Sequence, residues 1–280
     1  MKILKTISEL RSELNRYNQK NLRIGFVPTM GALHEGHLSL VKQSVSENFV
    51  TVVSVFVNPT QFNDKKDLER YPRDLEKDCK LLKPVGCNLV FAPSVDEMYP
   101  EPDTRRFDFG ELETVMEGAH RPGHFNGVGQ IVSKLFDIVQ PNRAYFGLKD
   151  FQQLAIIRKL VKDYHYPVEI VPCAIVRESD GLAMSSRNML LTEEHRNAAP
   201  FIYHTLNKLQ ELTINSTTAA KEFIRKQFAE NKFLDLEYFE IVDDENLQPV
   251  DFIEKNRTYS ACIAVFAGKI RLIDNVQLNS

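Results

Sequence analysis

The sequence contains few cysteines and no long apolar run. Its four cysteines, Cys79, Cys87, Cys173 and Cys262, are dispersed, and no two of them form a C-x-x-C pair. This usage is typical of free or buried thiols in a reducing compartment and argues against disulfides or a thiolate metal site. The longest apolar runs, such as residues 261–267, fall far short of the roughly 20 residues that a helix needs to cross a bilayer. We therefore expect no membrane partner.

Strong charge is absent as well. A formal net charge of −3 over 280 residues gives no reason to expect a nucleic-acid partner. The amino-terminal segment MKILKTISEL lacks the apolar core of a signal peptide and continues into an amphipathic helical pattern, so we expect a cytoplasmic protein. A hydrophobic content of 43% and a charged content of 26% indicate an ordinary globular protein, whose length allows one or two domains.

Up to residue 177 the apolar pattern alternates between strand and helix. The strand at 50–57 is apolar almost throughout, which indicates burial on both faces of a parallel sheet. We therefore expect a Rossmann-like, doubly wound α/β domain over residues 1–177, with ligands beyond the carboxyl ends of its strands. The predicted strands are 23–27, 50–57, 88–92, 144–146 and 168–176, and the predicted helices are 38–48, 74–82, 129–139 and 152–164.

Beyond residue 177 the pattern changes. A polar loop (178–188) leads to a long predicted helix after Thr192 and a second helix at 218–231. Strands are predicted at 236–242, 261–267 and 269–273, the last two forming a hairpin around Gly268. Helices followed by antiparallel strands indicate a smaller α+β domain over residues 178–280.

The segment PTMGALHEGH (28–37) carries the strongest local signal. It follows an apolar run and opens a helical pattern, and if that helix begins near Leu33, His34 and His37 share one face of its first turn. Helix amino termini and imidazole N–H groups both suit phosphate, so the segment is a candidate nucleotide site. The order H-E-G-H does not match the H-E-x-x-H zinc motif. On spacing alone, ordinary surface histidines remain an equal alternative.

Amides follow the second predicted strand. Asn58 and Gln61 cap turns in the ordinary interpretation, but an amide also matches a ligand that bears a hydroxyl and a carboxylate. Gln153, one helical turn beyond the strand at 144–146, is expected to point to the same crevice. The glycine-rich run at 120–129 does not follow a strand, so it is not a dinucleotide fingerprint, although its helix start offers N–H groups to an anion.

Two further segments offer groups for phosphate. Lys149 directly follows the strand at 144–146, where it is either a solvated lysine or a phosphate ligand. Asp150 either caps the next helix or helps to hold a metal ion. The segment MSSRN (184–188) places two hydroxyls beside a guanidinium, which is apt for a triphosphate but equally acceptable in a solvated linker.

Taken in order, these segments resemble the pantothenate synthetase (pantoate–β-alanine ligase) family over nearly the whole chain. The segment 28–37 resembles the H-x-G-H signature of adenylate-forming nucleotidyltransferases, and 184–188 resembles their Lys-Met-Ser-Lys-Ser-like counterpart. One departure is that family members commonly have Gly-Glu-Lys-Asp where this chain has Gly-Leu-Lys-Asp (147–150). The segments that carry the resemblance are PTMGALHEGH (28–37), VNPTQF (57–62), RYPRDL (70–75), RPGHFNGV (121–128), AYFGLKDFQQL (144–154) and MSSRN (184–188).

The resemblance implies an activity in two steps. Pantoate attacks the α-phosphate of ATP to give pantoyl adenylate and pyrophosphate, and the amine of β-alanine then attacks the acyl carbon and releases AMP. Mg²⁺ is implied on the phosphates with no direct protein cage, Asp150 being the one candidate ligand. The resemblance also implies a homodimer and a C-terminal domain that closes over the nucleotide as a lid.

Roles for individual residues follow from the same resemblance. His34 and His37 are expected to grip the phosphates and stabilise the transition state, and the position of His37 is usually named in the family as the proton donor. The groups expected to bind the β- and γ-phosphates are Lys149, Ser185, Ser186 and Arg187. Pantoate is expected to contact Gln61, Gln153, Asn58, Met30 and Phe62. The full predicted ATP-binding set is Met30, Gly31, Ala32, Leu33, His34, Glu35, Gly36, His37, Gly147, Leu148, Lys149, Asp150, Val176, Met184, Ser185, Ser186 and Arg187.

Other functions stay open from the residues alone. A nucleotidyltransferase with another small acceptor shares the histidine segment but does not explain the paired amides. A nucleotide-binding protein without catalysis has no need of groups that stabilise a transition state. An aminoacyl-tRNA synthetase is disfavoured because the chain is short, slightly acidic and lacks an evident tRNA-binding region.

Overall fold

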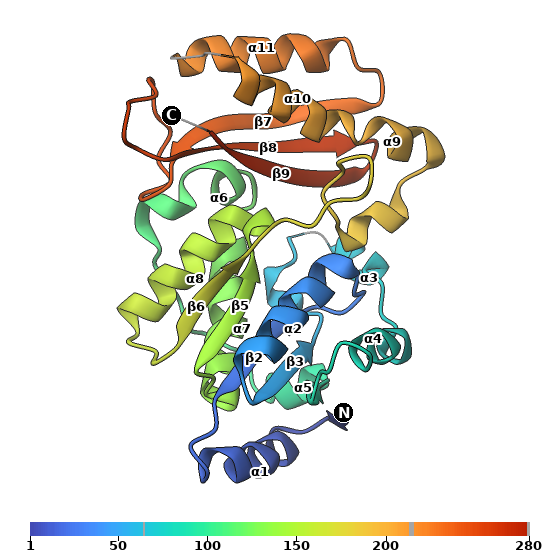
Figure 1. Cartoon of the computed structure of the whole chain (residues 1–280), viewed down its shortest axis with the longest axis vertical. Coiled ribbons are helices and arrows are strands. Elements are labelled where there is room, and N and C mark those ends of the chain that lie inside the picture. The colour runs from blue at the N-terminus through green and yellow to red at the C-terminus, as the bar shows by residue number, and fades with distance from the viewer. Residues whose placement is uncertain (64, 213–215, 279–280) are drawn as a thin grey trace. The chain divides into compact units, whose positions relative to one another are not determined.

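Two separate β-sheets organise the chain in the computed structural model, which describes residues 1–63, 65–212 and 216–278 (Figure 1). Contacts divide the chain into two compact units. Unit 1 comprises Met1–Gly110, Arg121–Leu148 and Gln153–Ala174, and unit 2 comprises Glu111–His120, Lys149–Gln152 and the chain from Ile175 onward. Within the described residues, no helix is long and apolar enough to span a membrane.

The sheet of unit 1 is entirely parallel. Its six strands lie in the order β1-β4-β3-β2-β5-β6, so the direction of winding reverses between β2 and β5. Ligands of doubly wound sheets bind at such a reversal, beyond the carboxyl ends of the strands. The predicted fold class is confirmed, although the short β1 was missed. The strands are β1 (Lys2–Leu4), β2 (Ile24–Thr29), β3 (Val50–Val55), β4 (Leu89–Phe91), β5 (Arg143–Gly147) and β6 (Glu169–Cys173).

Helices pack on both faces of this sheet. Phe26 of β2 is fully buried and lies 6.5 Å, centroid to centroid, from the ring of Phe136 on α7. The next residue, Val27, packs on the opposite face with Leu38 of α2 and Leu82 of α4. Burial on both faces explains why the strand sequences are apolar without alternation. The helices of this part of the chain are α1 (Ile7–Asn18), α2 (Glu35–Glu47), α3 (Lys65–Arg70), α4 (Leu75–Leu82), α5 (Val95–Met98), α7 (His124–Val139) and α8 (Phe151–Asp163).

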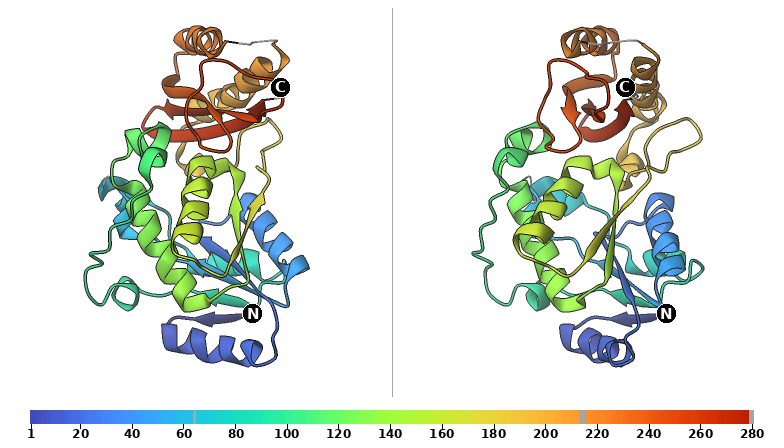
Figure 2. Two further views of the ribbon diagram at one scale, coloured as in Figure 1. Left: turned by 90° about the vertical axis from the view of Figure 1, so that its left-hand side faces the viewer. Right: turned by 60° about the vertical axis from the view of Figure 1, so that its left-hand side comes forward.

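Unit 2 is built on three antiparallel strands in the order β7-β8-β9. Gly268, with φ +61°, turns β8 into β9 and confirms the predicted hairpin. Figures 1 and 2 show α10 and α11 lying on one face of this sheet, where Ile224, Ile241 and Ile263 are among the buried core residues. The elements are α9 (Glu193–Ala198), α10 (Phe201–Glu211), α11 (Thr217–Ala229), β7 (Leu234–Asp243), β8 (Tyr259–Ala267) and β9 (Ile270–Leu278).

Two expectations about helices were wrong in detail. The single long helix after Thr192 is two helices, because Pro200 cannot donate a backbone hydrogen bond and a new helix begins beyond it. Helix α7 begins at His124 instead of residue 129, so Gly127 and Gly129 lie inside it. A Cβ at residue 127 would collide with the carbonyl oxygen of Thr60, so glycine there permits close packing against the 58–61 segment.

A segment from the middle of the sequence belongs to unit 2. It contains η2 (Gly110–Glu113) and α6 (Met116–His120). The buried carboxylate of Glu117 accepts two hydrogen bonds from Arg271 (2.8 and 2.7 Å) and one from the Tyr238 hydroxyl (2.8 Å). Burial, together with the charge of Glu117, raises the pKa of Tyr238 well above its ordinary value, so the phenol stays a donor. This network fastens the segment to β7 and β9.

Candidate active site

The two histidines adjoin at the carboxyl end of β2. Helix α2 begins at Glu35, three residues before the predicted range of 38–48, and His34 is its N-cap. The Nδ1 atom of His34 accepts a hydrogen bond from the Gly36 N–H at 3.1 Å. Because a backbone N–H can only donate, the neutral ring carries its proton on Nε2. The ring of His37 lies 4.1 Å away, centroid to centroid, so the pair presents imidazole groups side by side.

A buried carboxylate holds the loop before these histidines. Asp78 of α4 is 1% exposed and accepts hydrogen bonds from the N–H groups of Ala32 (3.1 Å) and Leu33 (2.8 Å). Burial raises the pKa of Asp78, while the two donors oppose that shift. Both residues belong to the predicted ATP-binding set, and their N–H groups bond to Asp78 in this structure.

Asp78 is a residue that the sequence reasoning missed. The loop it holds has positive φ at Gly31 (+80°), which glycine adopts freely, and at Ala32 (+51°), where such backbone persists only if its surroundings fix it. A signal was available, because Asp78 shares the buried face of α4 with Leu75 and Leu82. An acid on the apolar face of an amphipathic helix indicates a specific polar partner.

The amide segment after β3 gathers three predicted residues of unit 1. It forms the short helix η1 (Pro59–Gln61). Gln61 donates from Nε2 to the sulfur of Met30 at 3.3 Å, which links the amide loop to the histidine loop. Asn58 is almost fully buried, donates to Gln61 Oε1 at 3.2 Å and accepts from the Tyr99 hydroxyl at 2.7 Å. These contacts make Asn58 a residue that shapes the loop.

The RPGHFNGV segment supports that amide loop. His124 Nδ1 lies 2.9 Å from the carbonyl oxygen of Gln61, and Asn58 donates to the carbonyl oxygen of Gly127 at 3.3 Å. The segment thus packs against residues 58–61, and the role of its helix start as an anion site stays a prediction. Phe62, at the end of the segment, packs edge-on against Tyr71 with ring centroids 5.7 Å apart.

The residues after β5 belong partly to each unit. Gly147 ends β5, and Leu148, Lys149 and Asp150 form η3 (Leu148–Asp150). The Lys149 ammonium lies 3.7 Å from the Asp150 carboxylate, and its side chain is 19% exposed. Asn275 of β9 donates to the carbonyl oxygen of Lys149 at 3.0 Å.

Adjacent glutamines differ in their surroundings. Gln152 is buried in unit 2, where it accepts from the Glu117 N–H (2.8 Å) and donates to the carbonyl oxygens of Leu112 (2.6 Å) and Val115 (2.9 Å). Gln153 lies half-buried in the first turn of α8 and belongs to unit 1. Local spacing alone could not separate these two side chains, since both stand at the start of the same helical pattern.

The hydroxyl–guanidinium segment forms a compact loop in unit 2. The Met184 N–H donates to the carbonyl oxygen of Val176 at 3.0 Å, which brings these two predicted residues together. Ser185 is the N-cap of η4 (Ser186–Leu190), and its hydroxyl accepts from the Arg187 N–H at 3.2 Å. Arg177, at the base of the loop, makes a bidentate ion pair with Asp274 at 2.6 and 3.0 Å.

Contacts bring together several of the predicted residues within each unit. Unit 1 gathers Met30, His34, His37, Asn58 and Gln61 where β2 and β3 end. Unit 2 holds Lys149, Asp150, Val176 and the 184–187 segment, which is joined through β9. The first turn of α2 adds Glu35, which pairs with Lys42 at 3.3 Å on the surface.

No protein cage for a metal is seen in the described part of the chain. No group of three or more His, Cys, Asp or Glu side chains there is arranged to hold an ion. A single carboxylate such as Asp150, which is 49% exposed, nevertheless suits Mg²⁺ that is bound chiefly by substrate phosphates. All four cysteines are free, and burial raises the pKa of Cys87 to about 12, so that thiol is inert.

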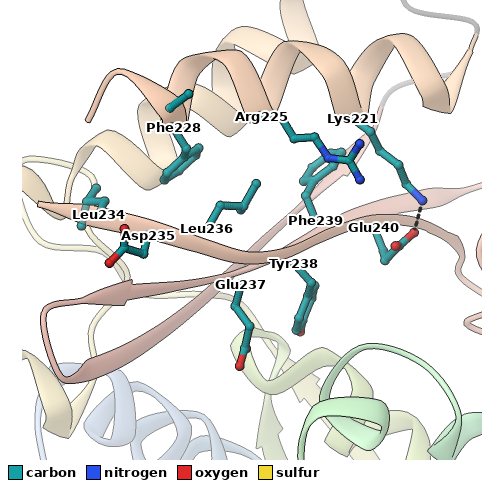
Figure 3. Close-up of a pocket in the computed structure, with 11 residues that line it drawn as sticks. Lys221, Arg225, Phe228, Leu234, Asp235, Leu236, Glu237, Tyr238, Phe239 and Glu240 are labelled. Carbon is teal, nitrogen blue, oxygen red and sulfur yellow. Dashed lines mark ion pairs between the residues drawn. The ribbon is translucent and has the colours of Figure 1, made fainter. Parts of the chain in front are cut away.

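An open pocket in unit 2 is unrelated to these groups. It has a volume of about 480 Å³, and Figure 3 shows it between α11 and β7, with Lys221 paired to Glu240 at 2.6 Å. Glu237 and Tyr238 point to the side of β7 away from α11, toward the network of Glu117 and Arg271. None of the predicted site residues lines this pocket.

Comparison with known proteins shows to which family the chain belongs. Residues 2–277 match the family model described as pantoate–β-alanine ligase. The chain belongs to the pantoate–β-alanine ligase family. It is 57% identical to the pantothenate synthetase of Bacteroides thetaiotaomicron over 278 residues, which covers 99% of each chain. The resemblance inferred from the motifs is thereby confirmed.

Solved pantoate–β-alanine ligases share the fold. The pantothenate synthetase of Thermus thermophilus superposes with a TM-score of 0.91 at 44% identity, covering 99% of both chains. The pantoate–β-alanine ligase of Francisella tularensis, solved in complex with β,γ-ATP and β-alanine, superposes with a TM-score of 0.84 at 37% identity, covering 99% of this chain and 97% of that one. The family relationship thus extends over both sheets.

Proposed function

We propose that the protein condenses pantoate with β-alanine at the expense of ATP, through a pantoyl adenylate, and releases AMP and pyrophosphate. The observation that carries this proposal is the adjoining pair His34 and His37, at the carboxyl end of β2 where the sheet winding reverses, in a chain of the pantoate–β-alanine ligase family. The complex of the Francisella tularensis relative with β,γ-ATP and β-alanine supports ATP and β-alanine as substrates.

The chemistry requires activation of a carboxylate. A carboxylate is a poor electrophile because oxide would have to leave. In the first step, a pantoate carboxylate oxygen bonds to the α-phosphorus of ATP, and the bond from that phosphorus to the bridging oxygen of pyrophosphate breaks. In the second step, the amine of β-alanine bonds to the acyl carbon, AMP departs with the bonding electron pair, and the amine loses a proton.

The histidines suit the first step. With Nδ1 of His34 occupied by the Gly36 N–H, its Nε2–H is the donor directed to ligands, and it would bind a phosphate oxygen. His37, 4.1 Å away between ring centroids, would stabilise the charge that develops at the α-phosphate or protonate a phosphate oxygen. The loop fixed by Asp78 would keep both rings in place before substrate binds.

The groups of unit 2 suit pyrophosphate. Lys149, Ser185, Ser186 and Arg187 would bind the β- and γ-phosphates and stabilise them as they leave. Mg²⁺, held by those phosphates and by Asp150, would supply charge neutralisation. The backbone at Gly147 and Val176 would line the adenosine site.

Pantoate would be recognised mainly in unit 1. Gln61 and Gln153 offer donors and acceptors for its hydroxyl and carboxylate groups, while Met30 and Phe62 offer apolar surface for its methyl groups. A site built to pair those hydroxyls rejects analogues that lack them, because its amides would be left unpaired. Asn58 would contribute by holding Gln61 in place.

The proposal also covers the roles of the two domains, the cellular location and the oligomeric state. We place ATP and pantoate binding in residues 1–177 and a lid function in 178–280, with segments 111–120 and 149–152 moving with the latter because they share unit 2. A cytoplasmic location and a homodimer are likewise proposed. Gel filtration with light scattering tests the homodimer, and a monomeric mass would reject it.

The reaction is tested by following AMP and pyrophosphate from ATP and Mg²⁺ with pantoate, with and without β-alanine. We expect AMP release to require both substrates. A folded, ATP-binding protein that turns over with another acceptor but not with pantoate would indicate a different nucleotidyltransferase. Tight ATP binding with no AMP formed from any acceptor would indicate the non-catalytic alternative.

A further inference from the structure

Two consecutive residues of β9, Asp274 and Asn275, fasten both phosphate-binding segments of unit 2. Both side chains are nearly buried, at 4% and 7% exposure. Asn275 donates from Nδ2 to the carbonyl oxygen of Lys149 at 3.0 Å. Asp274 accepts from both terminal nitrogens of Arg177 at 2.6 and 3.0 Å, and Arg177 is the residue from which the 177–188 loop departs.

Arg177 in turn organises that loop. It donates to the carbonyl oxygens of Gly181 (3.2 Å) and Asn275 (3.3 Å), and its guanidinium lies 3.8 Å from the ring centroid of Tyr203. Backbone pairing of Arg177 with Ala183 closes the loop two residues before Ser185. Moving Arg177 and the start of this loop away from β9 would therefore break a bidentate ion pair with a buried carboxylate, which is costly.

The two attachments differ in strength. The loop of Ser185–Arg187 is held by the ion pair, several hydrogen bonds and the Tyr203 stack. Lys149 lies in the one-turn helix η3, and the contact from Asn275 joins its backbone to the same strand. The backbone N–H of Asn275 also donates to Asp274 Oδ1 at 2.8 Å, which helps to hold the carboxylate in place on β9. Asn275 thus connects the backbone of Lys149 to the strand that also holds Arg177 and the loop that follows it.

We propose that Asn275 is a positioning residue, which sets Lys149 relative to Ser185–Arg187 so that the ammonium and the guanidinium meet one triphosphate. The proposal rests on the proposed function. It predicts that Asn275 acts on ATP through Lys149 and has no part in pantoate recognition, because the contacts of Asn275 described above concern the phosphate-binding segments.

The test is a double-mutant cycle of Asn275→Ala and Lys149→Met, read by calorimetric titration with MgATP and by KM values for ATP and pantoate. Loss of one buried hydrogen bond should weaken MgATP binding about 10-fold in the wild-type background. In the Lys149→Met background the same change should alter affinity by no more than about twofold, since coupled residues are not additive. The KM for pantoate should stay within about twofold throughout.

Gln277→Ala is the matched control, because Gln277 is an exposed amide of β9 that donates to Asp244 at 3.1 Å. It should leave MgATP affinity unchanged. The proposal would be overturned if Asn275→Ala weakened MgATP binding equally in both backgrounds. It would also be overturned if the KM for pantoate rose as much as MgATP affinity fell, or if Gln277→Ala lost the same MgATP affinity. If Asn275→Ala does not fold, Asn275→Ser replaces it in the cycle. Absence of pantoate turnover in the wild type would reject the proposed function, yet the calorimetric cycle would still decide the role of Asn275.

Discussion

Unit 1 and unit 2 present different kinds of chemical group. In unit 1 the candidate residues are imidazole and amide side chains, those of His34, His37 and Gln61, on loops fixed by Asp78 and His124. In unit 2 they are cationic and hydroxyl groups held against β9 by an ion pair and an amide. The contrast suggests a division of labour. Unit 1 would recognise pantoate and stabilise the attacked phosphorus, and unit 2 would hold the leaving pyrophosphate.

The largest effect is expected from His37→Ala. Removal of a single transition-state donor costs about 100- to 1000-fold in rate, and a unit 1 residue should lower kcat far more than it raises the KM for ATP. Steady-state kinetics with circular dichroism measures activity and folding together. His204→Ala, an exposed histidine of α10, is the matched control. A His37→Ala variant within a few-fold of wild type would remove His37 from the chemical step.

Lys149→Met tests the other side of the contrast. Loss of a charge-assisted contact with phosphate should raise the KM for ATP by about 10- to 100-fold, with the KM for pantoate nearly unchanged. Lys159→Met, which removes an exposed partner of Asp163 on α8, should leave both values as they are. A shift in the pantoate KM as large as that for ATP would break the proposed division of labour.

Gln153→Ala and Gln152→Ala sharpen the contrast at adjacent positions. Gln153→Ala should raise the KM for pantoate by about 10-fold without lowering the melting temperature, because only a ligand contact is lost. Gln152→Ala removes three hydrogen bonds to the 112–117 segment and should lower the melting temperature by several degrees. Thermal scans and steady-state kinetics on both variants measure the melting temperature and the KM for pantoate. The opposite assignment of effects would show that pantoate is bound elsewhere.

The smallest effect concerns acid stability of unit 1. The hydrogen bonds from Arg105 lower the pKa of Asp103 to about 2 from its ordinary value of 3.8. A depressed folded pKa gives stability that is present above the unfolded value and is lost as the pH falls through the folded one. Asp103→Asn should therefore cost about 2 kcal/mol of unfolding free energy at pH 7, with the difference shrinking below about pH 4.

Urea unfolding at about pH 7 and pH 3 measures that difference. Asp163→Asn, which removes an exposed ion pair with Lys159, should cost less than about 1 kcal/mol at either pH. A constant penalty for Asp103→Asn across this range would mean that the charge of Asp103 does not contribute.

Most of the parallel sheet could be predicted from apolar runs, since burial on both faces leaves a strong local signal, as in residues 50–55. The three-residue β1 could not, because so short a strand has no period of its own and is defined by pairing with β4. The assignment of residues 111–120 to unit 2 could not be predicted from the sequence either. It depends on Glu117 meeting Arg271, a contact across 154 positions of sequence.

The residues proposed to contact substrate were easier to find than those that hold them. His34 and Lys149 lie at strand ends, where the fold class itself predicts ligands. Asp78, His124 and Asn275 act on the backbone of distant loops, and their partners cannot be read from local spacing. Of these three residues, only Asp78 gives a signal in the sequence, because it is an acid on the apolar face of an amphipathic helix.

Pantoate-dependent exchange of labelled pyrophosphate into ATP, measured without β-alanine, tests the proposed reaction most directly. The exchange isolates the first step, because it reports pyrophosphate release and recapture without the second substrate. The proposed reaction predicts exchange that requires pantoate and falls by about 100-fold or more in His37→Ala. Exchange that is absent from the folded, ATP-binding wild type, or that proceeds without pantoate, would contradict it.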